Sequence, residues 1–95
     1  MEVIKPGQLV CSLAGRDKGN YYFVLRRDDK KLVWVVDGKR KTISAPKKKN
    51  ELHLQKHNYI CRAFAEQLDT GKLTDSSISY YLKEALKEKD IKREV

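Results

Sequence analysis

The sequence predicts an α+β domain: a small five-stranded β-barrel followed by a C-terminal helical hairpin that packs on it. Two patterns lead to this fold class. Short apolar runs separated by turn signals fill the first part of the chain, and apolar residues at helical spacing fill the second. With 95 residues, the chain is long enough for one compact unit, with the barrel over residues 1–57 and the hairpin over residues 58–95.

The barrel strands are predicted from apolar runs that end at turn residues. The pair Asp37-Gly38 is the clearest turn signal, because both central positions of a two-residue hairpin loop must tolerate positive φ. Five short strands joined by tight turns are typical of a small barrel. The expected strands are Leu9–Ala14, Tyr21–Leu25, Leu32–Val36, a short run around Thr42–Ile43, and Leu52–Leu54.

Two of these strands, Tyr21–Leu25 and Leu32–Val36, are apolar on both faces. One face fills the barrel, so the other needs a cover. Two amphipathic helices supply it. The first is expected to start near His57 or Asn58 and to end near Thr70-Gly71, and the second to follow a cap at Thr74 or Asp75. Their apolar positions are Ile60, Phe64, Ala65 and Leu68 in the first helix and Ile78, Tyr81, Leu82, Ala85 and Leu86 in the second.

The net charge of +8 is unevenly distributed. Residues 1–60 hold 14 Lys and Arg against 6 Asp and Glu, whereas residues 61–95 hold 7 of each. All the excess charge therefore belongs to the barrel part. A one-sided positive field attracts polyanions, of which RNA, DNA and anionic membrane surfaces are the candidates.

The composition excludes several classes of protein. No apolar run is long enough to span a bilayer, and the N-terminus lacks the basic start and apolar core of a signal peptide. Cys11 and Cys61 stand far apart in no paired motif, so both are expected as reduced thiols. We therefore expect a cytoplasmic protein. Of the candidate polyanions we expect nucleic acid and not a membrane to be the partner, and we expect a monomer because the helices have an internal surface to cover.

The stretch from Pro6 to Gly19, P-G-Q-L-V-C-S-L-A-G-R-D-K-G, continues to Val24 and resembles a KOW motif. In that motif a strand enters a Gly-basic-Asp-Lys-Gly loop and leaves as a second strand carrying a valine. The later segment Leu32–Gly38, which ends in Val-Asp-Gly, resembles the one that follows in KOW-type proteins of the large ribosomal subunit. One position departs: Tyr22 stands where KOW motifs often place a glycine.

Over almost its full length the chain is most similar to small stand-alone KOW-domain RNA-binding proteins of Gram-positive bacteria. The resemblance implies an SH3-like barrel that binds RNA or a ribosome-associated partner. It points to ribosomal RNA, the ribosome or ribosomal proteins as partners, and to a role in ribosome assembly or translation.

The candidate RNA-binding residues form two groups. Arg16 and Lys18 present charge at the tip of the loop between Gly15 and Gly19, where the alternative is an ordinary β-turn. The second group is a run of six cations within 11 residues with no acid among them, where the alternative is a solvated, solubilising surface. Its members are Lys39, Arg40, Lys41, Lys47, Lys48 and Lys49. Contacts of this kind read RNA shape and backbone rather than a base code.

We expect structural roles for the aromatic, histidine and cysteine residues. Tyr21, Tyr22, Phe23 and Trp34 are expected in the core or facing the helices, with base stacking as the alternative. The residues Cys11, His53, His57 and Cys61 include a His-x3-His spacing, but they lack a local Cys pair, so no zinc site is expected.

We expect no enzyme and no cofactor. The chain contains no nucleophile with an adjacent base, no paired carboxylates and no phosphate-binding loop ending in Gly-Lys-Ser/Thr. The preferred hypothesis is a non-catalytic RNA-binding protein. The alternative is a protein-interaction adaptor in the transcription or translation machinery, in which apolar side chains carry the affinity. DNA binding ranks third, because no helix has a basic recognition face.

Overall fold

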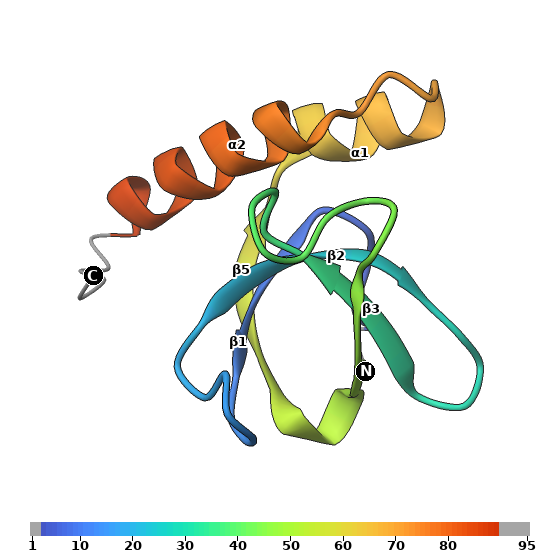
Figure 1. Ribbon diagram of the computed structural model, residues 1–95, viewed down its shortest axis with the longest axis vertical. Coiled ribbons are helices and arrows are strands. Elements are labelled where there is room, and N and C mark those ends of the chain that lie inside the picture. Colours follow the sequence, from blue (N-terminus) through green and yellow to red (C-terminus); the bar gives the residue numbers. More distant parts are fainter. Residues whose placement is uncertain (1–2, 90–95) are drawn as a thin grey trace.

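The computed structural model describes residues 3–89 and contains a five-stranded antiparallel sheet with two helices (Figure 1). The strand order is β4-β3-β2-β1-β5, and the sheet is open, with β4 and β5 as its edges. The elements are β1 (Gln8–Ser12), β2 (Tyr21–Arg27), β3 (Leu32–Val36), β4 (Lys47–Asn50), the 3-10 helix η1 (Glu51–His53), β5 (Leu54–Ile60), α1 (Arg62–Asp69) and α2 (Asp75–Glu88).

The three central strands, β1, β2 and β3, bury apolar residues on both of their faces. Alternate side chains of a strand point to opposite sides, so the same strands feed two separate apolar clusters. The inner cluster lies within the curve of the sheet and contains Ile4, Val10, Tyr22, Val24, Val33, Val35 and Leu54. The helix-covered cluster contains Leu9, Phe23, Val36, Cys61, Phe64, Ile78, Leu82, Ala85 and Leu86. The prediction that helices cover the second apolar face is confirmed.

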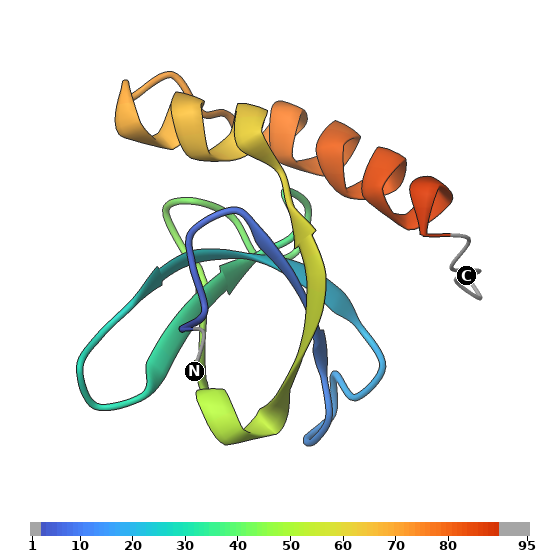
Figure 2. The same ribbon diagram turned by 180° about the vertical axis from the view of Figure 1, so that it is seen from behind.

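The two helices cross one end of the sheet (Figures 1 and 2). In both views α1 runs to one side, the chain turns back, and α2 runs to the other. Phe64 of α1 lies against Phe23 of β2, with ring centroids 5.3 Å apart. Of the two predicted caps, Thr74 is the one that caps α2, because its side chain accepts a hydrogen bond from the amide of Ser77. Residues 90–95 of the predicted hairpin lie outside the described residues.

Two expected boundaries are wrong, one because strand pairing continues further than the sequence pattern suggests and one because a 3-10 turn, capped by Asn50, precedes the last strand. His57 and Asn58 do not cap α1; they lie in β5, which pairs with β1 as far as Ile60, and Cys61 occupies the N-cap. The expected final strand at Leu52–Leu54 is mostly the turn η1, and β5 begins only at Leu54.

The expected strand around Thr42–Ile43 is also wrong. That segment is a loop held against α2, where the amide of Ile43 donates a hydrogen bond to a side-chain oxygen of Asp75. The fourth strand is instead the lysine run that follows Pro46, which pairs with β3 in register from Val35–Lys47 to Leu32–Asn50. The predicted basic cluster is therefore partly a β-strand at the edge of the sheet.

No described helix is long and apolar enough to cross a membrane.

Candidate nucleic-acid interface

A buried polar network lies under the loop that joins β1 to β2. Asp17 Oδ1 accepts hydrogen bonds from Lys49 Nζ at 2.8 Å and from Ser12 Oγ at 3.0 Å, and Asp17 Oδ2 accepts one from the Tyr22 hydroxyl at 2.8 Å. Lys49 Nζ also donates to Ser12 Oγ at 2.7 Å and to the carbonyl of Ala14 at 2.9 Å. Both charges are thus paired and hydrogen-bonded, which buried charges require.

The network fixes the charge state of its acid. Burial by itself raises the pKa of the Asp17 carboxyl, but the hydrogen bonds from Lys49, Tyr22 and Ser12 outweigh that effect and lower the pKa to about 2. Burial also raises the pKa of Tyr22 to about 12, and its hydrogen bond to Asp17 acts in the same direction. At neutral pH the carboxylate is ionised and the tyrosine is a neutral donor.

The same aspartate shapes the loop above it. Gly15 and Gly19 have φ values of 86° and 90°, in the left-handed region that glycine adopts without strain. The amide of Asn20 donates to the carbonyl of Asp17, and the amide of Gly19 donates to the carbonyl of Ser12. With its middle residue anchored beneath, the loop carries Arg16 and Lys18 exposed on either side of Asp17.

The structure separates the three consecutive lysines of β4. Lys48 is exposed and pairs with Trp34 on the outer side of the sheet. Lys47 and Lys49 point to the other side, where Lys47 is half-buried. Lys49 is 8% exposed, so the expectation that it lies on the RNA-binding surface is wrong: its ammonium binds Asp17 inside the molecule.

The segment from Lys39 to Lys41 lies at the other end of the sheet, beneath the helices (Figures 1 and 2). Asp37 organises it, because Asp37 Oδ1 accepts hydrogen bonds from the backbone amides of all three basic residues. Lys39 and Arg40 are exposed, and Lys41 is half-buried. The loop is therefore a fixed structure that presents two cations.

The predicted residues do not form one continuous rim. The loop that carries Arg16 and Lys18 lies at the η1 end of the sheet, where the Leu13 amide donates to the His53 carbonyl. The loop that carries Lys39 and Arg40 lies at the helix end, where Gly38 approaches α2 (Figures 1 and 2), and Lys48 lies in the edge strand β4. Within residues 3–89, no carboxylate lies within ion-pair distance of any of these five side chains. We call these five residues the basic surface; their charge is available to a partner.

Sequence reasoning missed an exposed cation that lies on the same face of the sheet as Lys48. Arg26 of β2 lies opposite Trp34 of β3, with its guanidinium carbon 3.8 Å from the centroid of the indole ring. Only the strand register reveals this pairing, because the two residues belong to different runs of the sequence. A β-bulge between Val24 and Arg26 places Arg26 beside the tryptophan.

The residues weighed as zinc ligands are not brought together. In the part of the chain that the structure describes, no three His, Cys, Asp or Glu side chains are grouped to hold a metal ion. Cys11 and Cys61 are buried free thiols. The ring of His57 lies 5.4 Å from that of Tyr21, and burial lowers the pKa of this histidine, with Lys89 adding to the effect.

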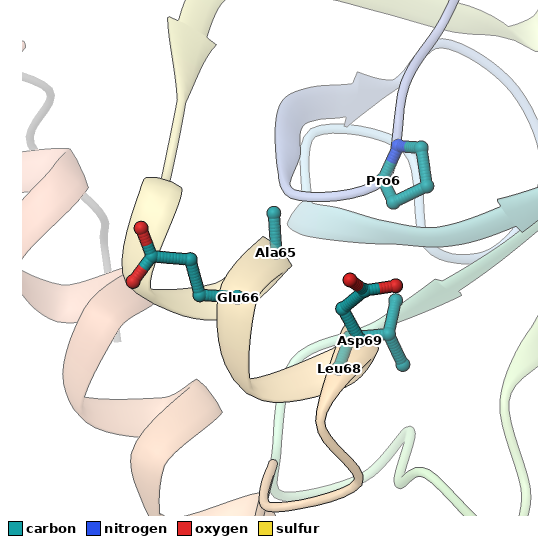
Figure 3. A pocket seen from close by; sticks show the side chains of 5 residues that line it. All are labelled: Pro6, Ala65, Glu66, Leu68 and Asp69. Atoms are coloured by element: carbon teal, nitrogen blue, oxygen red, sulfur yellow. The ribbon is translucent and has the colours of Figure 1, made fainter.

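A shallow hollow lies between α1 and the segment before β1 (Figure 3). It is lined by Pro6, Ala65, Glu66, Leu68 and Asp69. Its charged groups are two carboxylates, which repel nucleic-acid phosphates. The hollow is therefore not part of the candidate interface.

Comparison with protein-family models and with curated proteins finds no match to this chain.

Proposed function

We propose that this chain is a non-catalytic RNA-binding protein of the KOW type that binds ribosomal or other structured RNA and assists translation or ribosome assembly in the cytoplasm. The basic surface, Arg16, Lys18, Lys39, Arg40 and Lys48, contacts the phosphate backbone. The observation that carries the proposal is that two loops, each held by hydrogen bonds to an aspartate, present four of these cations at the surface, and that no acidic partner neutralises them among the described residues. Phosphates are the polyanions that such a surface attracts.

The arrangement of the strands supports an SH3-like fold of the KOW type. β1 lies between β2 and β5, so the last strand returns to pair with the first, and a single turn of 3-10 helix joins β4 to β5. The loop carrying the Gly-Arg-Asp-Lys-Gly sequence lies between the first two strands, as the motif requires. Asp17 of this loop accepts a hydrogen bond from the buried Lys49, whereas the flanking Arg16 and Lys18 are exposed.

The separation of the basic surface into two ends favours a structured RNA. The longest extent of the molecule is 33 Å, so a folded RNA of similar size contacts both ends at once. The loops at both ends are fixed by hydrogen bonds to Asp17 and Asp37, so little conformational entropy is lost when RNA binds. Contacts to phosphates give affinity and orientation without base specificity.

The test is the salt dependence of RNA binding, measured by fluorescence anisotropy with a labelled ribosomal RNA fragment. Neutralising about five phosphates on a single-stranded RNA gives a log–log slope of about −3.5. The double variants Arg16→Glu/Lys18→Glu and Lys39→Glu/Arg40→Glu each remove two contacts, so each makes the slope shallower by about 1.4. The control variant Lys72→Glu/Lys83→Glu changes the net charge equally at two exposed residues near and on α2.

The proposal is wrong if the wild-type protein binds no RNA at low salt, or if the control variant lowers the affinity as much as the two others. In the first case the protein does not bind RNA, and in the second case the binding does not depend on the basic surface.

One observation favours the adaptor function as a second candidate. Leu13 and Leu52 are 45% and 72% exposed, and the Leu13 amide donates to the carbonyl of His53, so the two leucines flank the same turn. Exposed apolar side chains around one turn are a candidate surface for protein contacts. The variant Leu52→Glu abolishes association with a protein partner if the adaptor function is correct, and leaves RNA affinity unchanged if the chain binds RNA through the basic surface.

A further inference from the structure

Trp34 occupies an unusual place among the aromatic residues of the strands. Tyr21, Tyr22, Phe23 and Tyr59 each pack in one of the two apolar clusters or against it. Trp34 belongs to neither cluster and is half-buried on the outer side of the sheet. Its large ring is therefore not explained by packing of the core.

The two neighbours of Trp34 across the strands are both exposed cations. Arg26 lies opposite it in β2 and Lys48 lies opposite it in β4, so the row Arg26–Trp34–Lys48 crosses three adjacent strands. Neighbouring strands are about 4.8 Å apart, so the row spans about 10 Å, which is comparable to the length of a nucleotide. Within the described residues, Arg26 and Lys48 form no ion pair with a carboxylate.

The Arg26 guanidinium lies over the indole ring of Trp34, and we call this pair the platform. The guanidinium carbon lies 3.8 Å from the ring centroid, in the range of a stacked cation–π contact. The contact covers one side of the indole and holds the guanidinium in place, while Arg26 itself remains exposed to solvent. Arginine planes and aromatic rings are the two groups on which proteins stack unpaired RNA bases.

We propose that the row Arg26–Trp34–Lys48 binds one unpaired nucleotide of RNA. The base stacks on the Arg26 guanidinium, which the indole supports from beneath, and Lys48 binds the adjacent phosphate. This inference rests on the proposed RNA-binding function and adds a ligand class to it: single-stranded segments, loops or bulges. A base in a regular duplex is stacked on its neighbours on both sides and offers no free face.

The single tryptophan of the chain provides a direct readout. A 12-nucleotide oligoadenylate lowers the emission of Trp34 and moves its maximum to shorter wavelength, because the nucleotide that extends from Arg26 to Lys48 covers the exposed part of the half-buried ring between them. Two control RNAs of equal length separate base from backbone: an abasic oligonucleotide and a 12-base-pair duplex. Both carry phosphates, and neither changes the emission even where anisotropy shows that they bind.

Arg26→Lys keeps the positive charge and removes the stacking plane. This variant binds oligoadenylate about fivefold more weakly than wild type, with an unchanged salt slope, and its affinity for the duplex stays the same. The matched control is Arg62→Lys, the same change at an exposed arginine of α1, which keeps wild-type affinity. Both substitutions are at exposed positions, so the variants fold.

Failure of the platform and failure of RNA binding give different results. If anisotropy shows oligoadenylate bound while Trp34 emission is unchanged and Arg26→Lys binds as wild type, the platform is wrong and RNA binding stands. If the wild-type protein binds no RNA of any kind at low salt, the proposed function fails and the platform fails with it.

Discussion

Lys49 Nζ lies 2.8 Å from Asp17 Oδ1 in a site where the two side chains are only 7% and 11% exposed. The pair joins the edge strand β4 to the loop between β1 and β2, which are 32 residues apart in the sequence. Of two consecutive lysines in β4, Lys49 therefore stabilises the fold, whereas Lys48 remains exposed.

Removing the ammonium of Lys49 leaves the Asp17 carboxylate buried without its main partner. Breaking a buried ion pair in this way is strongly destabilising, so Lys49→Met lowers the free energy of unfolding by about 3 kcal/mol in urea denaturation. Lys48→Met is the matched control: the same substitution at the next residue, which is exposed, changes it by less than about 0.5 kcal/mol. Equal effects of the two variants would contradict the buried network.

The lowered pKa of Asp17 makes stability depend on pH in the acid range. The pKa is about 2 in the folded protein and 3.8 in an ordinary environment, so between these values the unfolded chain binds the proton more readily. The contribution of this group, about 2 kcal/mol, is complete above about pH 5 and is lost progressively as the pH falls through the folded-state pKa of about 2.

An NMR titration of the Asp17 side-chain carboxyl carbon measures this directly. A midpoint near pH 2 agrees with the network, and the Lys49→Met variant moves it upward because the strongest stabilising hydrogen bond is gone. A midpoint near 3.8 in the wild-type protein would show that the carboxylate is not held as described.

The loop that carries Lys39 and Arg40 depends on a close approach to α2. At Gly38, where φ is 82°, an added Cβ meets the carbonyl oxygen of Asp75 and the amide nitrogen of Ser79. Gly38→Ala therefore adds a backbone clash to the conformational strain and costs about 3 kcal/mol of stability in urea denaturation. Gly71→Ala, also at positive φ but with no atom near the added Cβ, costs about 1 kcal/mol. A smaller loss at Gly38 than at Gly71 would be inconsistent with the docked loop.

Much of the fold is predictable because local patterns and tertiary packing agree. Leu32–Val36 is predicted and found as β3 at the same residues, since a β-branched apolar run between turns has no competing structure. The fourth strand is not predictable in this way. The sequence of β4, K-K-K-N, has no apolar residue, and its strand conformation comes from pairing with β3.

For the candidate site, the sequence predicts which residues are basic, but it does not predict which of them are exposed or which side chains they contact. Charge density identifies the basic residues, and the KOW-like loop singles out Arg16 and Lys18. The sequence gives no sign that Lys49 turns inward, because its partner Asp17 belongs to a distant loop. The pairing of Arg26 with Trp34 likewise depends on a β-bulge, which shifts the register at one residue of β2.

The central claim, that the basic surface binds RNA, is tested most directly by sedimentation of the tagged protein from cell lysate through a sucrose gradient, followed by sequencing of crosslinked RNA. We predict co-migration with ribosomal particles at low salt. It is lost at high salt and in a variant with Arg16, Lys18, Lys39 and Arg40 changed to glutamate, whereas Lys72→Glu/Lys83→Glu migrates as wild type. Wild-type protein that stays at the top of the gradient at low salt, with no enriched RNA, would contradict the claim.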